Sequence, residues 1–134
     1  MNDAGREPDL VLHRIPEAAR ARAEALGFRD EQCRFCVRSD LDTSGAEAEV
    51  WTLVAADRLV SIILSGPRAG THIGPFAFKD IQKVRTVQRV GSAFLQLLIE
   101  GLYVDVARYS NTHRERFGRV AVHLKRMLEG EPLP

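Results

Sequence analysis

The sequence of 134 residues lacks long apolar stretches, a surplus of either charge and abundant cysteine. No apolar run approaches the ~20 residues that a helix needs to span a bilayer, so no membrane-spanning helix is expected. The polar start, residues 1–8, lacks the apolar centre of a signal peptide, which makes a cytoplasmic location the expectation. With 45% hydrophobic and 28% charged residues, the composition is typical of one globular domain.

The two cysteines, Cys33 and Cys36, have C-x-x-C spacing but lack a second pair. A structural zinc site would need those additional ligands. A redox pair would be expected at the start of a helix. Residues 33–41 instead alternate as a half-buried strand does, so that positions i and i+3 would point to opposite faces. The pattern therefore predicts two ordinary cytosolic thiols.

An acidic turn imitates the start of a calcium-binding loop without completing it. Asp40, Asp42 and Ser44-Gly45 match the first positions of such a loop. Its twelfth position, where a bidentate glutamate is required, is Trp51. Asx-type turn chemistry explains the same residues without a metal, so no calcium site is expected.

Motifs for catalysis and for cofactor binding are also missing. The chain contains no H-E-x-x-H, no G-x-S-x-G and no glycine-rich loop that ends in G-K-S or G-K-T. The histidines are scattered over segments that we expect to form different elements: His13, His72, His113 and His123. We therefore expect no enzyme activity, no metal and no cofactor.

The clearest element that the sequence does contain is a C-terminal helix over residues 110–128. Its apolar residues recur at the spacing of one helical face: Phe117, Val120, Ala121, Leu124 and Leu128. Ser110 or Asn111 is expected to cap the start, and Gly130 to end the helix. We expect this amphipathic helix to cover the open side of a sheet.

The middle of the chain predicts that sheet. Alternating apolar residues and turn signals indicate seven strands, at 33–41, 48–55, 59–64, 71–78, 81–90, 93–99 and 102–109. Gly74-Pro75 suits an edge position for 71–78, because proline cannot donate to a neighbouring strand. The spacing of apolar residues by three in 81–90 favours a bulged strand, with a helix as the alternative.

The N-terminal part predicts a short alanine-rich helix over 16–26, with Pro16 in its first turn and Gly27 at its end. We expect residues 1–12 to be frayed, residues 13–129 to form the domain and residues 130–134 to begin a linker.

Two groups of residues are candidates for binding a partner. Basic residues gather in one predicted loop and along the segment after it: Arg68, Lys79, Lys83, Arg85 and Arg89. Such a group can attract anionic lipid head groups at about 1 kcal/mol per residue, or can simply be a solvated outer face. No aromatic residues interleave with it as nucleic-acid binding requires. The weak edge strand could pair with a partner strand through Thr71, Ile73 and Phe76.

Seven strands followed by one helix resemble the pleckstrin-homology (PH) superfold. Short motifs are similar to those of bacterial PH-like domains: Trp51 to Leu59 with Asp57-Arg58-Leu59, Phe76 to Val84, Val90 to Leu95, and Arg108-Tyr109-Ser110-Asn111. With Asp40-Leu41-Asp42 and Glu129 to Leu133, they resemble the N-terminal domain of some bacterial ABC exporters, where it precedes fused permease and ATP-binding regions. The resemblance implies an α+β, mainly β fold: a seven-stranded antiparallel half-barrel capped by the C-terminal helix.

The same resemblance implies a non-catalytic interaction or regulatory module. It would be the cytosolic N-terminal domain of an ABC-transporter-like membrane protein, at the inner face of the membrane, and would dock a segment of a parent or associated membrane protein. One alternative is a peripheral module that binds an anionic membrane surface through its basic strand face. The third and least favoured is a small enzyme with a cleft between helix and sheet. No nucleic-acid partner is expected.

Overall fold

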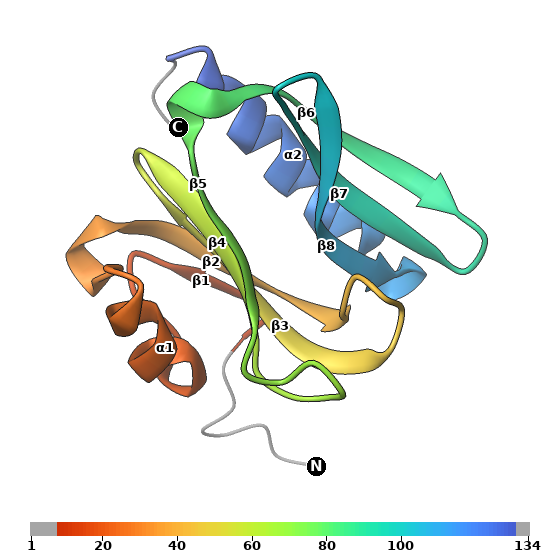
Figure 1. The fold of residues 1–134 in the computed structure, drawn as a ribbon, viewed down its shortest axis with the longest axis horizontal. Helices are drawn as coiled ribbons and strands as arrows, with labels where there is room; N and C mark the ends of the chain where they lie inside the picture. The colour runs from red at the N-terminus through yellow and green to blue at the C-terminus, as the bar shows by residue number, and fades with distance from the viewer. Residues whose placement is uncertain (1–7, 131–134) are drawn as a thin grey trace.

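A computed structural model of the chain describes residues 8–130, which form mainly antiparallel strands (Figure 1). The strands are β1 (Leu10–Leu12), β2 (Cys33–Leu41), β3 (Glu47–Ala55), β4 (Arg58–Ile63), β5 (His72–Ala77), β6 (Ile81–Arg89), β7 (Ser92–Ile99) and β8 (Leu102–Ser110). The helices are α1 (Arg20–Ala25) and α2 (Arg114–Leu128). Short 3-10 turns join them: η1 (Glu17–Ala19), η2 (Asp30–Gln32), η3 (Phe78–Asp80) and η4 (Asn111–His113). No helix within residues 8–130 is both long and apolar enough to cross a bilayer.

The strands form one antiparallel sheet in the order β5-β4-β3-β2-β8-β7-β6, with β1 on the outer edge of β2. Consecutive strands are neighbours except β5 and β6, which lie at opposite ends of this order. Within residues 8–130, the one pairing between non-consecutive strands joins β2 to β8, where Leu41 pairs with Arg108. Both ends of the strand order are open, so the sheet does not close. The edge position of β5 and the strand assignment of β6 are confirmed, including a register shift after Ile81.

The eighth strand, β1, corrects the expectation that residues 1–12 are frayed. Residues 1–7 lie outside the described part of the chain, but Leu10–Leu12 pair with β2. The physical reason is the edge of β2: β8 pairs with it at Leu41, which leaves Phe35 to Val37 open to β1. Val11 also buries its side chain and is only 3% exposed.

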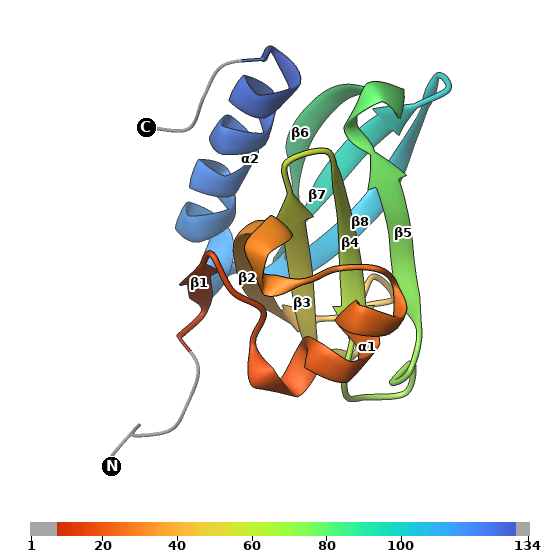
Figure 2. The ribbon, with the colours of Figure 1, turned by 90° about the vertical axis from the view of Figure 1, so that its left-hand side faces the viewer.

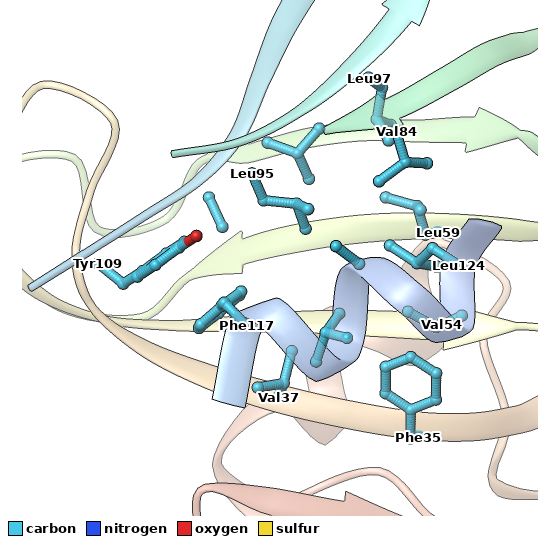
Figure 3. Packing of buried hydrophobic residues seen from close by; sticks show 14 of the residues in the cluster. Phe35, Val37, Val54, Leu59, Val84, Leu95, Leu97, Tyr109, Phe117 and Leu124 are labelled. Atoms are coloured by element: carbon cyan, nitrogen blue, oxygen red, sulfur yellow. The ribbon is translucent and has the colours of Figure 1, made fainter. Parts of the chain in front are cut away.

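The first core lies under α2, and we call it the helix-side core (Figure 3). Strands from both halves of the sheet supply it together with α2: Phe35, Val37, Val54, Leu59, Ile81, Val84, Ala93, Leu95, Leu97, Val106, Ala107, Tyr109, Phe117, Val120, Ala121 and Leu124. The predicted apolar stripe of the helix is therefore confirmed, with Leu128 partly buried beside it. Tyr109 and Phe117 stack with ring centroids 4.2 Å apart.

The predicted cap of this helix is wrong. α2 begins at Arg114, and neither Ser110 nor Asn111 caps it with a side chain. The Ser110 N–H donates to Asp40 Oδ1 at 2.9 Å, and its hydroxyl donates to Asp40 Oδ2 at 2.5 Å. Ser110 thus ties the end of β8 to β2, a contact between residues seventy positions apart that local capping rules do not anticipate.

Replacement of Asp40 by asparagine should reduce the acid sensitivity of folding. Burial alone would raise the pKa of Asp40, but the hydrogen bonds from Ser110 and the nearby His113 lower it overall from the usual 3.8. A carboxylate with a lowered pKa stabilises the fold above its unfolded pKa, and this contribution is lost as the pH falls through the folded pKa. Urea unfolding should therefore show that Asp40→Asn lowers the free energy of unfolding by less at pH 3 than at pH 6. A penalty equal at both pH values would contradict this role.

The second core lies on the opposite face of β2, β3 and β4, and we call it the N-terminal core. The N-terminal segment and the strands supply it: Val11, Ile15, Ala19, Ala23, Phe28, Cys33, Cys36, Trp51, Leu53, Ala55, Val60 and Ile62. Figure 1 shows α1 and α2 on different sides of these strands. The strands β2 to β4 are therefore buried on both faces, and the expectation of a half-buried strand at 33–41 is wrong. The predicted helix over 16–26 is confirmed as η1 followed by α1.

Candidate functional site

The predicted basic residues do not form one cluster. Arg68 lies in the loop before β5 and Lys79 lies in η3 after it. The six residues of β5 span about 20 Å, so these two residues are at opposite ends of that strand. Lys83, Arg85 and Arg89 alternate along β6 and share one exposed face of it.

Arg85 is held by neighbours within the sheet. Its Nε donates to Gln96 Oε1 at 2.8 Å, and its guanidinium lies 3.5 Å from the centroid of the Tyr103 ring. Gln96 in turn donates from Nε2 to Asp105 Oδ1 at 2.7 Å. A lipid phosphate would have to compete with these contacts, so the freely presented charges of this face are those of Lys83 and Arg89.

The predicted pairing edge is at the end of the sheet but offers few backbone groups. The carbonyl of Thr71 already accepts from the Ile63 N–H at 3.0 Å, and Ile73 pairs with β4. Phe76 packs against the helix-side core. Pro75 has no N–H, so a strand added along this edge would lose a hydrogen bond there.

A groove that the sequence did not predict lies between β1 and the first turns of α2. It has a volume of about 420 Å³. Its lining comes from β1, β2 and α2: Leu10, Leu12, His13, Arg34, Phe35, Arg116, Arg119, Val120 and His123. Figure 2 shows β1 beside the N-terminal end of α2. Leu10 and Leu12 are 39% and 61% exposed, which is unusual for adjacent apolar residues on one strand face.

The backbone of β1 also presents an open edge toward a partner. The Asp9 carbonyl accepts from the Arg38 N–H at 2.8 Å, and the His13 N–H donates to the Arg34 carbonyl at 3.1 Å. In an antiparallel pair, residues that bond to one neighbour alternate with residues that face the other side. Leu10 and Leu12 therefore direct their N–H and C=O groups away from β2.

Three arginines give the groove a cationic rim. Arg116 pairs with Asp9 at 3.2 Å and donates to His113 Nδ1 at 2.6 Å, and Arg119 pairs with Glu115 at 3.0 Å on the exposed side of the helix. Within residues 8–130 the Arg34 side chain has neither a hydrogen bond nor an ion pair, and it is exposed. The rim is therefore positive, with Arg34 as its unpaired charge.

The floor of the groove adds a polar atom without a partner. His123 Nδ1 is buried and has no hydrogen-bond partner among the described residues, and the imidazole lies 6.4 Å from the Phe35 ring. Apolar side chains, cations and imidazoles suit a ligand that is both apolar and acidic. The lining contains no carboxylate, hydroxyl or thiol, and residues 8–130 contain no group of three or more acidic, histidine or cysteine side chains placed to hold a metal.

No protein-family model, no curated protein and no solved structure matches the chain.

Proposed function

We propose that this domain is a non-catalytic interaction module that docks an extended protein segment in the groove between β1 and α2. The observation that carries the proposal is the combination at Leu10 and Leu12 of exposed apolar side chains and outward-facing backbone groups. A partner strand could pair with this edge by β-augmentation, which supplies affinity through main-chain hydrogen bonds. Its apolar side chains would enter the groove over Phe35 and Val120.

The charges of the rim favour an acidic partner. In the part of the chain that the structure describes, Arg34 is the unpaired charge of the rim, whereas Arg116 and Arg119 already pair with Asp9 and Glu115. Electrostatic complementarity selects partners of opposite charge. We therefore infer that the docked segment alternates apolar and acidic residues, with acidic side chains facing Arg34.

We also propose a PH-like arrangement for the domain, as a half-barrel with α2 over its open side. The sequential strand order, broken only where β2 meets β8, and the position of α2 after the last strand support this proposal. The resemblance to domains ahead of bacterial ABC exporters makes a segment of a parent or associated membrane protein the expected ligand. A coding sequence that continues after Pro134 into apolar spans and an ATP-binding region would support that context, whereas an immediate stop codon would remove it.

Replacement of Arg34 by glutamate should weaken the binding of an acidic apolar strand about tenfold, because a favourable charge pair becomes a repulsive one. The probe is a dye-labelled peptide of alternating leucine and glutamate, titrated by fluorescence anisotropy at fixed salt. Lys83→Glu is the matched control, since it makes the same change of charge on exposed β6. The wild type should bind a peptide of alternating leucine and lysine much more weakly.

Backbone amide shifts locate the bound peptide. We expect the largest NMR shifts at Leu10, Leu12 and the α2 residues of the groove. Shifts that gather along β5 would refute the groove and support the edge that the sequence indicated. Vesicle binding that rises with anionic lipid and falls with Lys83→Glu, without any peptide binding, would replace the proposal by the membrane alternative.

A further inference from the structure

The two cysteines lie on the same face of β2, which corrects the expectation that they point to opposite faces. The register between β2 and β3 shifts between Cys33 and Phe35, as at a β-bulge. This shift turns Cys33 away from the side of Phe35 and Val37 and toward Cys36. Both thiols therefore belong to the N-terminal core, and their sulfur atoms are 4.0 Å apart.

Both thiols are buried, but only Cys33 lines a pocket at the surface. Cys33 borders a polar pocket of about 290 Å³ between β2 and the turn from β3 to β4. The pocket is lined by His13, Glu31, Gln32, Cys33, Arg34, Ala56, Asp57 and Arg58. Cys33 is 3% exposed, whereas Cys36 is absent from this lining and has no exposed surface. A small molecule in the pocket would therefore meet Cys33 first.

The thiols also differ in chemistry. The Cys36 thiol lies 3.4 Å from the Arg14 carbonyl and 4.0 Å from Cys33 Sγ, and both are acceptors for its single proton. The hydrogen bond to Cys33 lowers the pKa of Cys33. Burial and the negative charge of Asp30 oppose this lowering of the pKa, whereas the positive charge of Arg58 adds to it. The same hydrogen bond raises the pKa of Cys36, and burial raises it further. Cys33 thus has the properties of an attacking thiol and Cys36 those of a thiol that reacts second.

We propose that Cys33 and Cys36 form a thiol–disulfide exchange site that takes a low-molecular-weight disulfide from the pocket beside Arg58. The Cys33 thiolate attacks one sulfur of the small disulfide, the S–S bond of that molecule breaks, and one thiol leaves. Cys36 then loses its proton and attacks Cys33 Sγ, which releases the second thiol and leaves a Cys33–Cys36 disulfide. The protein loses two electrons and two protons, and the small disulfide gains them.

The site needs a modest movement of the two side chains. A disulfide bond is about 2.05 Å long, so the sulfur atoms must approach by about 2 Å from their present separation. Neither cysteine is already part of a disulfide, so both sulfur atoms are available for the new bond. Exchange at this site does not depend on docking in the groove, so each proposal can fail without the other.

Intact-mass spectrometry of the reduced, folded chain with oxidised glutathione tests the exchange site. The wild type should lose two hydrogen atoms and retain no glutathione. Cys36→Ser should accumulate a mixed disulfide with one glutathione at Cys33, whereas Cys33→Ser should react about tenfold more slowly or not at all. Circular dichroism checks that both variants remain folded.

The wild type gives an independent result if a variant does not fold. Equilibration in glutathione buffers of stepped redox potential should convert it between dithiol and disulfide, with peptide mapping placing the bond between Cys33 and Cys36. The proposal would be overturned by a folded wild type that stays reduced at every ratio of oxidised to reduced glutathione, or that reacts only in denaturant. Preferential glutathione addition at Cys36 would overturn the assigned order of attack.

Discussion

Replacement of Phe117 by alanine should lower the free energy of unfolding by about 3–5 kcal/mol, the range for truncating a fully buried phenylalanine. Phe117 has no exposed surface and stacks on Tyr109 with an interplanar angle of 7°. It lies where α2 meets the end of β8, near the pairing of Ser110 with Asp40. Truncation removes this aromatic contact and leaves a cavity between helix and sheet that the surrounding strands cannot close without distortion.

Urea unfolding followed by circular dichroism measures the effect, with Val122→Ala as the control. Val122 is on the same helix but 45% exposed, so its truncation should cost no more than about 0.5 kcal/mol. A loss below about 1 kcal/mol for Phe117→Ala would mean that α2 is not anchored in the helix-side core. Comparable losses for the two variants would point instead to helix propensity as the cause.

The packing of α2 could be predicted because its signal is local. Phe117, Val120, Ala121 and Leu124 repeat with the period of the helix, and any sheet that needs a cover will bury that stripe. The turn between β7 and β8 is local in the same way, because Glu100 and Gly101 both have positive φ, 52° and 80°, as a two-residue turn requires. The helix start could not be predicted, because Ser110 bonds to a residue of another strand.

The second core was missed because it joins segments that are individually uninformative. β1 has three residues, too few for an alternation to stand out, and the face of α1 is alanine. The bulge after Cys33 reverses the side-chain direction of that residue, and a strict alternation rule then assigns Cys33 to the wrong face. The second face of β2 is buried by the N-terminal segment, and the sequence alone does not show that this segment packs there.

The groove was missed because its residues are far apart in the sequence. Leu10 and Leu12, Arg34 and the first turns of α2 come together only through the pairing of β1 with β2. One signal was available: Arg116, Arg119 and His123 are spaced by three and four, so they share a helix face beside the apolar stripe. A row of two arginines and a histidine next to exposed leucines is a pattern that favours a binding surface. The basic residues of β6 were predicted as a binding group because they are close together in the sequence.

Replacement of Phe28 by alanine should also cost about 3–5 kcal/mol, although Phe28 precedes the sheet that the sequence predicted. Gly27, with φ of 84°, ends the helical segment, and the Phe28 N–H then donates to the Ala23 carbonyl at 2.9 Å. This geometry is a Schellman motif, and it turns the Phe28 ring onto β2 to β4 in the N-terminal core. The Arg58 guanidinium covers the ring at 4.4 Å.

Thermal and urea unfolding of Phe28→Ala should be compared with Glu24→Ala, which changes an exposed residue of α1 and should stay within about 0.5 kcal/mol of the wild type. If the N-terminal segment were an accessory to an independent sheet, Phe28→Ala would cost little and the amides of β2 would keep their hydrogen-exchange protection. We expect the opposite, since Phe28 holds α1 against β2, the strand with which β1 pairs. Loss of that packing should therefore destabilise the groove between β1 and α2 together with the fold.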